Sequence, residues 1–211
     1  MSNMSFIEGL AATAQPVARR RGAQDLVIIA LVVLVEVIGF SYFFDPERFA
    51  AYVDAAPRQM IMKIVLFSSL FVTSLAAALH SFEATARRLD PVILAGGSAV
   101  GLMGLMSFDY AMGPGLEATL LPRQGLGCLS AITLLSLPVC FAMGLLMTRA
   151  ASVQPGRTAL LIGLTGGAFG ATLFSLICPY TSLWYIGVWY GGAIIVSSAW
   201  CVRVLPDFNQ W

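Results

Sequence analysis

Charge is scarce in this chain. Of its 211 residues only 11% are Asp, Glu, Lys or Arg, 58% are hydrophobic, and the mean hydropathy is +0.83. Soluble domains carry about 25% charged residues, so this composition excludes an ordinary soluble domain and indicates an integral membrane protein. The formal net charge of +1 also argues against a nucleic-acid-binding face, and no direct nucleic-acid partner is expected.

Histidine and closely spaced cysteines are lacking as well. The single histidine, His80, excludes a bis-histidine haem and any metal centre built mainly from histidine. The four cysteines, at positions 128, 140, 178 and 201, form no C-x-x-C pair, which excludes a thioredoxin-like motif and a zinc ribbon. We expect neither a cofactor nor an enzymatic activity.

Long apolar runs dominate what is present. Each is about twenty residues long, enough to cross ~30 Å of hydrocarbon at ~1.5 Å per residue. They predict an all-α, polytopic membrane protein: a six-transmembrane-helix bundle over 26–205, with a segment 1–25 before it and a tail 206–211 after it. No small-residue cleavage pattern follows the first run, so we expect no signal peptide. The six runs are 26–44, 60–80, 91–113, 126–149, 158–178 and 183–205.

The basic residues predict the orientation, because Lys and Arg are retained on the cytoplasmic side. Eight fall in the N-terminal segment, the second and fourth loops and the tail, against four on the other face. Both termini are therefore expected in the cytoplasm. The eight are Arg19, Arg20, Arg21, Arg87, Arg88, Arg149, Arg157 and Arg203, and the four are Arg48, Arg58, Lys63 and Arg123.

The N-terminal segment has the pattern of a short amphipathic helix over 5–15. Ser5 and Glu8 fit a capping box, and Pro16 would end the helix. Two interpretations remain open: a partner-docking helix, or a basic topology anchor with a frayed end. The candidate partner-binding residues are Phe6, Ile7, Leu10, Pro16, Arg19 and Arg20.

Glycines recur at four-residue spacing in the spans. Such small-xxx-small faces let helix backbones approach closely in lipid, where apolar burial supplies no extra driving force. They favour a compact bundle over a pore or a hinge. The pairs are Gly97 and Gly101, Gly163 and Gly167 or Gly166 and Gly170, and Gly187 and Gly191.

Two ionisable residues lie within the spans. Glu36 is near the middle of the first, where a carboxylate costs at least ~2.5 kcal/mol, so we expect it to be neutral, paired or facing the bundle interior. Lys63 is about one turn inside the outer end of the second span and is expected to snorkel to the outer surface. One acid does not make a proton relay across the bilayer.

Two cysteines are expected at the same membrane face. Cys128 begins the fourth span and Cys178 ends the fifth, and consecutive antiparallel helices often pack side by side. In an oxidising compartment such a thiol pair can form a disulfide, be oxidised stepwise, or bind a soft metal ion as thiolates. A structural disulfide or unreactive thiols remain the alternative to sensing. Cys140 and Cys201 are expected in the core.

The turn after Cys178 is short. Pro179 ends the fifth span, Thr181 follows, and Ser182 is placed to cap the sixth. Four aromatic residues come next, of which the first two suit an interfacial belt. They are Trp184, Tyr185, Trp189 and Tyr190.

The sequence resembles the NrsF family of bacterial inner-membrane anti-sigma factors over most of its length. The strongest part is Cys178-Pro179 followed after ten residues by Trp189-Tyr190, with Thr181 and Ser182 in the turn. Similar features upstream are Cys128, Leu137-Pro138, the 154–157 loop before a glycine-rich helix, Leu10 and the 15–19 stretch. The family usually has a histidine before this cysteine and an acid after the proline, where this chain has Ile177 and Tyr180.

The resemblance implies a multi-pass protein of the bacterial inner membrane that holds an extracytoplasmic-function sigma factor inactive at the cytoplasmic face. The two missing ligands favour thiol oxidation, or a two-thiolate metal site at Cys128 and Cys178, as the trigger. A small transporter or channel, and an accessory or assembly subunit of a membrane complex, are the alternatives. The oligomeric state stays open.

Overall fold

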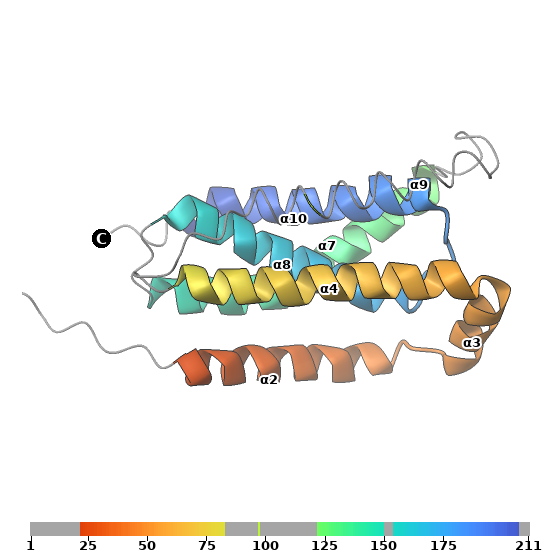
Figure 1. Ribbon diagram of the computed structural model, residues 1–211, viewed down its shortest axis with the longest axis horizontal. Helices are drawn as coiled ribbons and strands as arrows, with labels where there is room; N and C mark the ends of the chain where they lie inside the picture. The colour runs from red at the N-terminus through yellow and green to blue at the C-terminus, as the bar shows by residue number, and fades with distance from the viewer. Residues whose placement is uncertain (1–21, 83–96, 98–121, 150–153, 207–211) are drawn as a thin grey trace, which may run out of the picture.

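The fold is known from a computed structural model that describes residues 22–82, 97, 122–149 and 154–206. All regular elements in these residues are helical (Figure 1). The long ones are α2 (Gly22–Ser41), α4 (Pro57–Ser81), α7 (Pro122–Thr148), α8 (Pro155–Ser175) and a last span made of α9 (Leu183–Tyr185), the π-helix η1 (Ile186–Tyr190) and α10 (Gly191–Val204). These five spans are long and apolar enough to cross a membrane.

The sequence prediction of an all-helical membrane protein is confirmed, and the ends of the five described spans lie within a few residues of those predicted. The predicted third span, 91–113, lies outside the described residues except for position 97, so the total of six stays a prediction. Most of the predicted segment 1–25 and the end of the tail also lie outside them.

The short helix α3 (Pro46–Ala55), between α2 and α4, was not predicted. Asp45 caps it, because its carboxylate accepts hydrogen bonds from the backbone N–H groups of Glu47 at 3.1 Å and Arg48 at 3.2 Å. An Arg48–Asp45 ion pair of 3.0 Å adds to the cap. The signal was present in the sequence: an Asp followed by Pro is a common helix start, since proline lacks the N–H that the first helical position leaves unused.

Helix α8 is the centre of the bundle, because it packs against α4, α7 and α10. Its glycines permit this on two faces at once. A Cβ added at Gly163 would lie 2.4 Å from the Cα of Ser198 on α10. A Cβ added at Gly167 would lie 3.0 Å from the Cα of Ile194 on the same helix. A Cβ at Gly170 would lie 2.6 Å from the carbonyl oxygen of Ile132 on α7.

The opposite glycine pair completes that second face, since Gly166 lies against Cys140 and the carbonyl of Ser136 on α7. The sequence left the Gly163/Gly167 and Gly166/Gly170 faces as alternatives, and the structure uses both. Gly191 behaves differently: within the described part of the chain nothing lies within 4 Å of a Cβ added there, so it makes no close helix contact.

The described arginines fall into two sets at opposite ends of the bundle. Helices α7 and α8 run in opposite directions, as do α8 and α10, so Arg149, Arg157 and Arg203 share one end (Figure 1). Arg58 and Arg123, at the starts of α4 and α7, lie at the other end. This grouping agrees with the predicted arrangement, and the assignment of an end to the cytoplasm stays a prediction.

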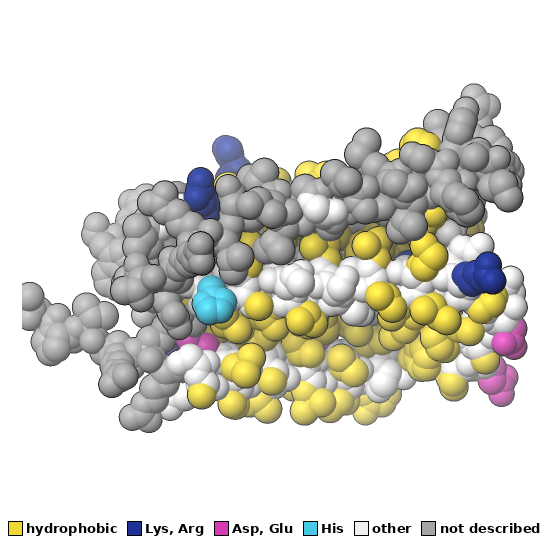
Figure 2. Space-filling model, viewed as in Figure 1, with side chains coloured by type: hydrophobic (Ala, Val, Ile, Leu, Met, Phe, Trp, Pro, Cys, Tyr) yellow, Lys and Arg dark blue, Asp and Glu magenta, His cyan; other side chains and the backbone are white. Residues whose placement is uncertain are grey.

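The outer surface between these ends is apolar. Figure 2 shows hydrophobic side chains spread along the face in view, over α2 and α4. On α2, for example, the exposed fraction is 56% for Leu31, 53% for Leu34 and 69% for Val35. Such a surface is stable in contact with lipid and unfavourable in water.

Close backbone packing of α8 predicts a large effect from adding a single methyl group. We expect Gly163→Ala and Gly170→Ala each to destabilise the protein by about 1–3 kcal/mol, because backbone atoms of a neighbouring helix must move. Gly191→Ala is the matched control and should change stability little. The measurement is thermal unfolding of the protein in detergent micelles. Equal melting temperatures for all three variants would contradict the packing described.

Candidate functional site

Cys128 and Cys178 meet at one end of the bundle. Cys128 lies in the second turn of α7, and Cys178 lies in the segment between α8 and α9, where its N–H donates to the carbonyl of Phe174 at 3.1 Å. Their sulfur atoms are 4.0 Å apart, both side chains are buried, and neither is in a disulfide. The structure therefore brings together the two cysteines that the sequence paired.

The hydroxyl of Tyr185 forms a hydrogen bond with Cys128, one of the two thiols. Its oxygen lies 2.9 Å from the Cys128 sulfur, and its ring packs against Tyr180 with 4.7 Å between centroids. Tyr185 is only 1% exposed. The prediction that Tyr185 belongs to an interfacial aromatic belt is therefore wrong: the hydroxyl of a buried tyrosine needs a polar partner, and Cys128 supplies one.

Lys63 also belongs to this site. It is 2% exposed, and its ammonium donates hydrogen bonds to the carbonyl oxygens of Cys178 at 2.9 Å and Tyr180 at 3.3 Å. The ammonium also lies 5.7 Å from the ring centroid of Tyr190. The prediction that Lys63 snorkels outward is wrong, because α8 and the following segment cover it and provide the acceptors. We call Lys63, Cys128, Cys178, Tyr185 and Tyr190 the thiol cluster.

The π-helix η1 contains two of the predicted aromatic residues, Trp189 and Tyr190, which make different contacts. A π-turn inserts one extra residue into the helix, which changes the direction of the side chains that follow, and such turns are frequent at functional sites. Tyr190 is fully buried and stacks on Phe67 at 5.2 Å between centroids. Trp189 instead packs against Gly125, where any added Cβ would overlap its ring.

Cys178 lies outside the membrane-spanning helices, and its surroundings favour the thiolate. The hydrogen bond from Cys128 is the main cause that lowers the pKa of the Cys178 thiol below its usual range, and the positive charge of Lys63 acts in the same direction while burial opposes both. A thiolate is the nucleophilic and metal-binding form of cysteine. The hydroxyl of Tyr190 lies beside Cys178 without a hydrogen bond of ordinary geometry.

The remaining predicted residues of the turn lie around the cluster. Pro179 is exposed and Thr181 is half-buried. Ser182 is at the N-cap position of α9, but its hydroxyl makes no capping hydrogen bond, so that part of the prediction is wrong. The candidate partner-binding residues Phe6, Ile7, Leu10, Pro16, Arg19 and Arg20 lie outside the described residues.

The other two cysteines are in the core of the bundle. Cys140 and Cys201 are buried, and the Cys140 thiol faces the carbonyl of Ile162 at 3.8 Å. The described residues bring no three His, Cys, Asp or Glu side chains together as a metal centre. Among the described His, Cys, Asp and Glu side chains, a metal ion at the thiol cluster would therefore have only the two thiolates of Cys128 and Cys178 as ligands.

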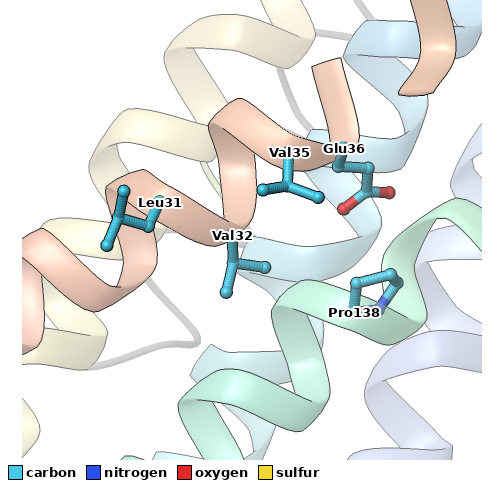
Figure 3. Close-up of a pocket in the computed structure, with 5 residues that line it drawn as sticks. All are labelled: Leu31, Val32, Val35, Glu36 and Pro138. Atoms are coloured by element: carbon cyan, nitrogen blue, oxygen red, sulfur yellow. The ribbon is translucent and has the colours of Figure 1, made fainter. Parts of the chain in front are cut away.

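Glu36 is not part of the thiol cluster. It lines an open groove of about 310 Å³ between α2 and α7, with its carboxylate beside Pro138 (Figure 3). Both carboxylate oxygens are buried and make no hydrogen bond. The other lining residues, Leu31, Val32 and Val35, are apolar, so the groove offers no polar path of the kind that a transporter requires.

Comparison with known families identifies a matching family. The family described as NrsF, Negative regulator of sigma F, matches residues 10–211. The chain belongs to the NrsF family. Its members are named as negative regulators of a sigma factor, which agrees with the resemblance noted from the residues. No curated protein and no solved structure matches the chain.

Sequence reasoning missed two members of the cluster in this NrsF protein, Lys63 and Tyr185. A signal existed for Lys63, because an ionisable residue inside a span usually faces the bundle interior. It was outweighed by the position of Lys63 near the end of the span, where a lysine commonly reaches the interface. For Tyr185, the sequence contains no feature that distinguishes a tyrosine in the core from one in an interfacial belt.

Burial predicts that the size of a reagent decides whether it reaches the pair. We expect a bulky maleimide to label Cys128 and Cys178 in the folded protein at least about tenfold more slowly than in denaturant, because labelling requires local opening. Replacement of the exposed Ser130 on the same helix, Ser130→Cys, is the matched control and should label rapidly in the folded protein. Mass spectrometry of the labelled peptides measures both rates, and rapid labelling of the native pair would contradict the buried geometry.

Proposed function

We propose that this NrsF protein is an anti-sigma factor of the bacterial inner membrane that sequesters an extracytoplasmic-function sigma factor at the cytoplasmic face. Thiol-directed stress in the periplasm, from an oxidant or a heavy metal, triggers release of the sigma factor. The observation that supports this trigger is that two buried thiols, not joined in a disulfide, lie 4.0 Å apart beside the Lys63 ammonium. A regulator of this kind acts by binding, and no enzymatic activity is proposed.

The distribution of charge supports the assignment of faces. Arg149, Arg157 and Arg203 share the end of the bundle opposite the thiol cluster, and the positive-inside rule assigns that end to the cytoplasm. The cluster is then at the periplasmic end, where the compartment is oxidising. The sigma factor binds at the other end, to the N-terminal segment and the adjacent basic loops.

Oxidation is the trigger that changes the structure most. Hydrogen peroxide converts the Cys178 thiolate to a sulfenic acid and releases hydroxide, and the Cys128 thiol then displaces water from the sulfenic acid to form the disulfide. A disulfide has a sulfur separation of about 2.05 Å, so the two sulfurs must come about 2 Å closer than in the present structure. Because both side chains are buried, rotating them or moving the turn to close this gap changes the packing around the pair.

A soft metal ion fits the present spacing more closely. Two metal–sulfur bonds of about 2.3 Å each can span sulfurs 4.0 Å apart without bringing them together. Cys128 now makes hydrogen bonds to Tyr185 and to Cys178, and metal–sulfur bonds would take the place of these hydrogen bonds. In either case a signal requires two arrangements of the bundle whose relative stability depends on the state of the thiols.

The thiol trigger predicts a loss of induction when both cysteines are replaced. In cells carrying Cys128→Ser and Cys178→Ser together, we expect transcription from a promoter of the released sigma factor to stay at its uninduced level after peroxide or cadmium treatment. The matched control replaces the other buried pair, Cys140→Ser with Cys201→Ser, and should retain induction. Continued induction in the first variant would refute the trigger.

The anti-sigma role predicts direct capture of a sigma factor. We expect the full chain, purified in detergent, to co-purify an extracytoplasmic-function sigma factor from the same genome, and a chain lacking residues 1–24 to lose it. The truncated chain must still reach the membrane, which fractionation verifies. Failure of both chains to capture any such sigma factor would defeat the role, while capture by both would move the contact away from the N-terminal segment.

A further inference from the structure

The ammonium of Lys63 is the most unusual charge among the described residues. It is the only lysine of the chain, it is 2% exposed, and it has no carboxylate partner among the residues that the structure describes. Placing an isolated ammonium in an apolar surrounding is costly unless hydrogen bonds compensate. The compensation here comes from the carbonyls of Cys178 and Tyr180 and from the face of the Tyr190 ring.

The two carbonyls depend on Lys63 in return. Cys178 and Tyr180 lie in the non-helical segment 178–182, so their carbonyl groups are not part of a helical hydrogen-bond ladder, and Pro179 between them has no N–H to donate. A buried carbonyl without a donor costs about 1–3 kcal/mol, and Lys63 supplies donors to two of them. The interaction therefore fixes the segment and the start of α4 to each other across more than 110 residues of sequence.

The hydrogen bonds of Lys63 connect the thiol pair to α4, a helix that runs to the other end of the molecule. The carbonyl that accepts the shorter hydrogen bond, at 2.9 Å, belongs to Cys178 itself. A movement of about 2 Å, of the size that disulfide formation demands, would exceed the range of that bond if the backbone of Cys178 takes part in it. From Lys63 to its end at Ser81, helix α4 extends about 27 Å toward the opposite end of the bundle.

We propose that Lys63 is the positioning residue of the thiol pair: it holds the segment with Cys178 against α4 in the reduced protein and loses these hydrogen bonds when the pair is joined. The loss frees the start of α4 from the segment, and the change is passed along the helix. This inference rests on the proposed function for its biological meaning, but the coupling of Lys63 to the thiols is a property of the chain alone.

The single lysine makes the coupling measurable. Reductive methylation with formaldehyde and a borane reagent, applied to the full chain in nanodiscs, modifies only Lys63 and the N-terminal amine, which serves as the internal reference. The experiment uses the Cys140→Ser, Cys201→Ser background, so that diamide can join only Cys128 and Cys178. We expect Lys63 to react at least about tenfold faster in the disulfide form than in the reduced form.

Two controls define this measurement. With Cys128→Ser added to the background no disulfide can form, and diamide should leave the rate at Lys63 unchanged. The reference amine should react equally in all samples. Equal rates at Lys63 in the reduced and disulfide forms, whether slow or fast, would overturn the proposal.

Substitution of Lys63 tests the same link from the other side. Lys63→Met removes the hydrogen bonds at similar side-chain length, and we expect labelling of Cys178 by a bulky maleimide to become at least about tenfold faster. Lys63→Arg keeps a cationic donor and should restore slow labelling, whereas Arg58→Met, which removes an exposed cation from the same helix, should leave labelling unchanged. Slow labelling in Lys63→Met would overturn the proposal, and if that variant does not fold, the methylation of the unsubstituted lysine decides.

Neither measurement contains a sigma factor. If the coupling is observed and no sigma factor is captured, the proposed function fails and the positioning role of Lys63 stands. If a sigma factor is captured and released while Lys63 stays equally protected in both thiol states, the positioning role fails and the proposed function stands.

Discussion

The bundle depends on the close approach of α8 to its neighbours. In lipid, apolar side chains gain nothing by leaving one hydrocarbon surrounding for another, so helices associate through dispersion contacts that require backbones to come close. Four of the five glycines of α8 provide this on two faces, Gly163 and Gly167 toward α10 and Gly166 and Gly170 toward α7. With α4 also packed on α8, the central helix is enclosed, and its end delivers Cys178 to a fixed position beside Cys128.

A thiol pair held in this way combines protection with reactivity. Burial keeps Cys128 and Cys178 from bulky reagents, while the hydrogen bond between them and the nearby charge of Lys63 favour the thiolate of Cys178. The same lysine holds the segment that carries Cys178. Cys178 is therefore both the residue whose thiol we propose to react and the residue whose carbonyl Lys63 holds. A regulator needs such a connection if a reaction at one membrane face is to alter binding at the other.

Much of this arrangement could be predicted from the sequence, and two of the failures share a cause. The helical spans, the pairing of Cys128 with Cys178 and the family follow from apolar run lengths, alternation of direction and local motifs. The outward placement of Lys63, the belt position of Tyr185 and the cap at Ser182 were wrong. The first two depend on which side of a helix faces the interior, and a run that is apolar all round does not show that. The cap at Ser182 depends instead on the direction of a single hydroxyl, which the residue type does not determine.

The sequence by itself determined that the chain is a helical membrane protein of the NrsF family, because hydrocarbon thickness sets the length of a span and motif residues are local. Only the tertiary structure decided that both glycine faces of α8 are used, that Trp189 and Tyr190 lie in a π-helix, and that the only lysine donates to the carbonyl of a cysteine 115 residues away. Those outcomes depend on helix rotation and depth, which are fixed when three neighbours pack on one helix together.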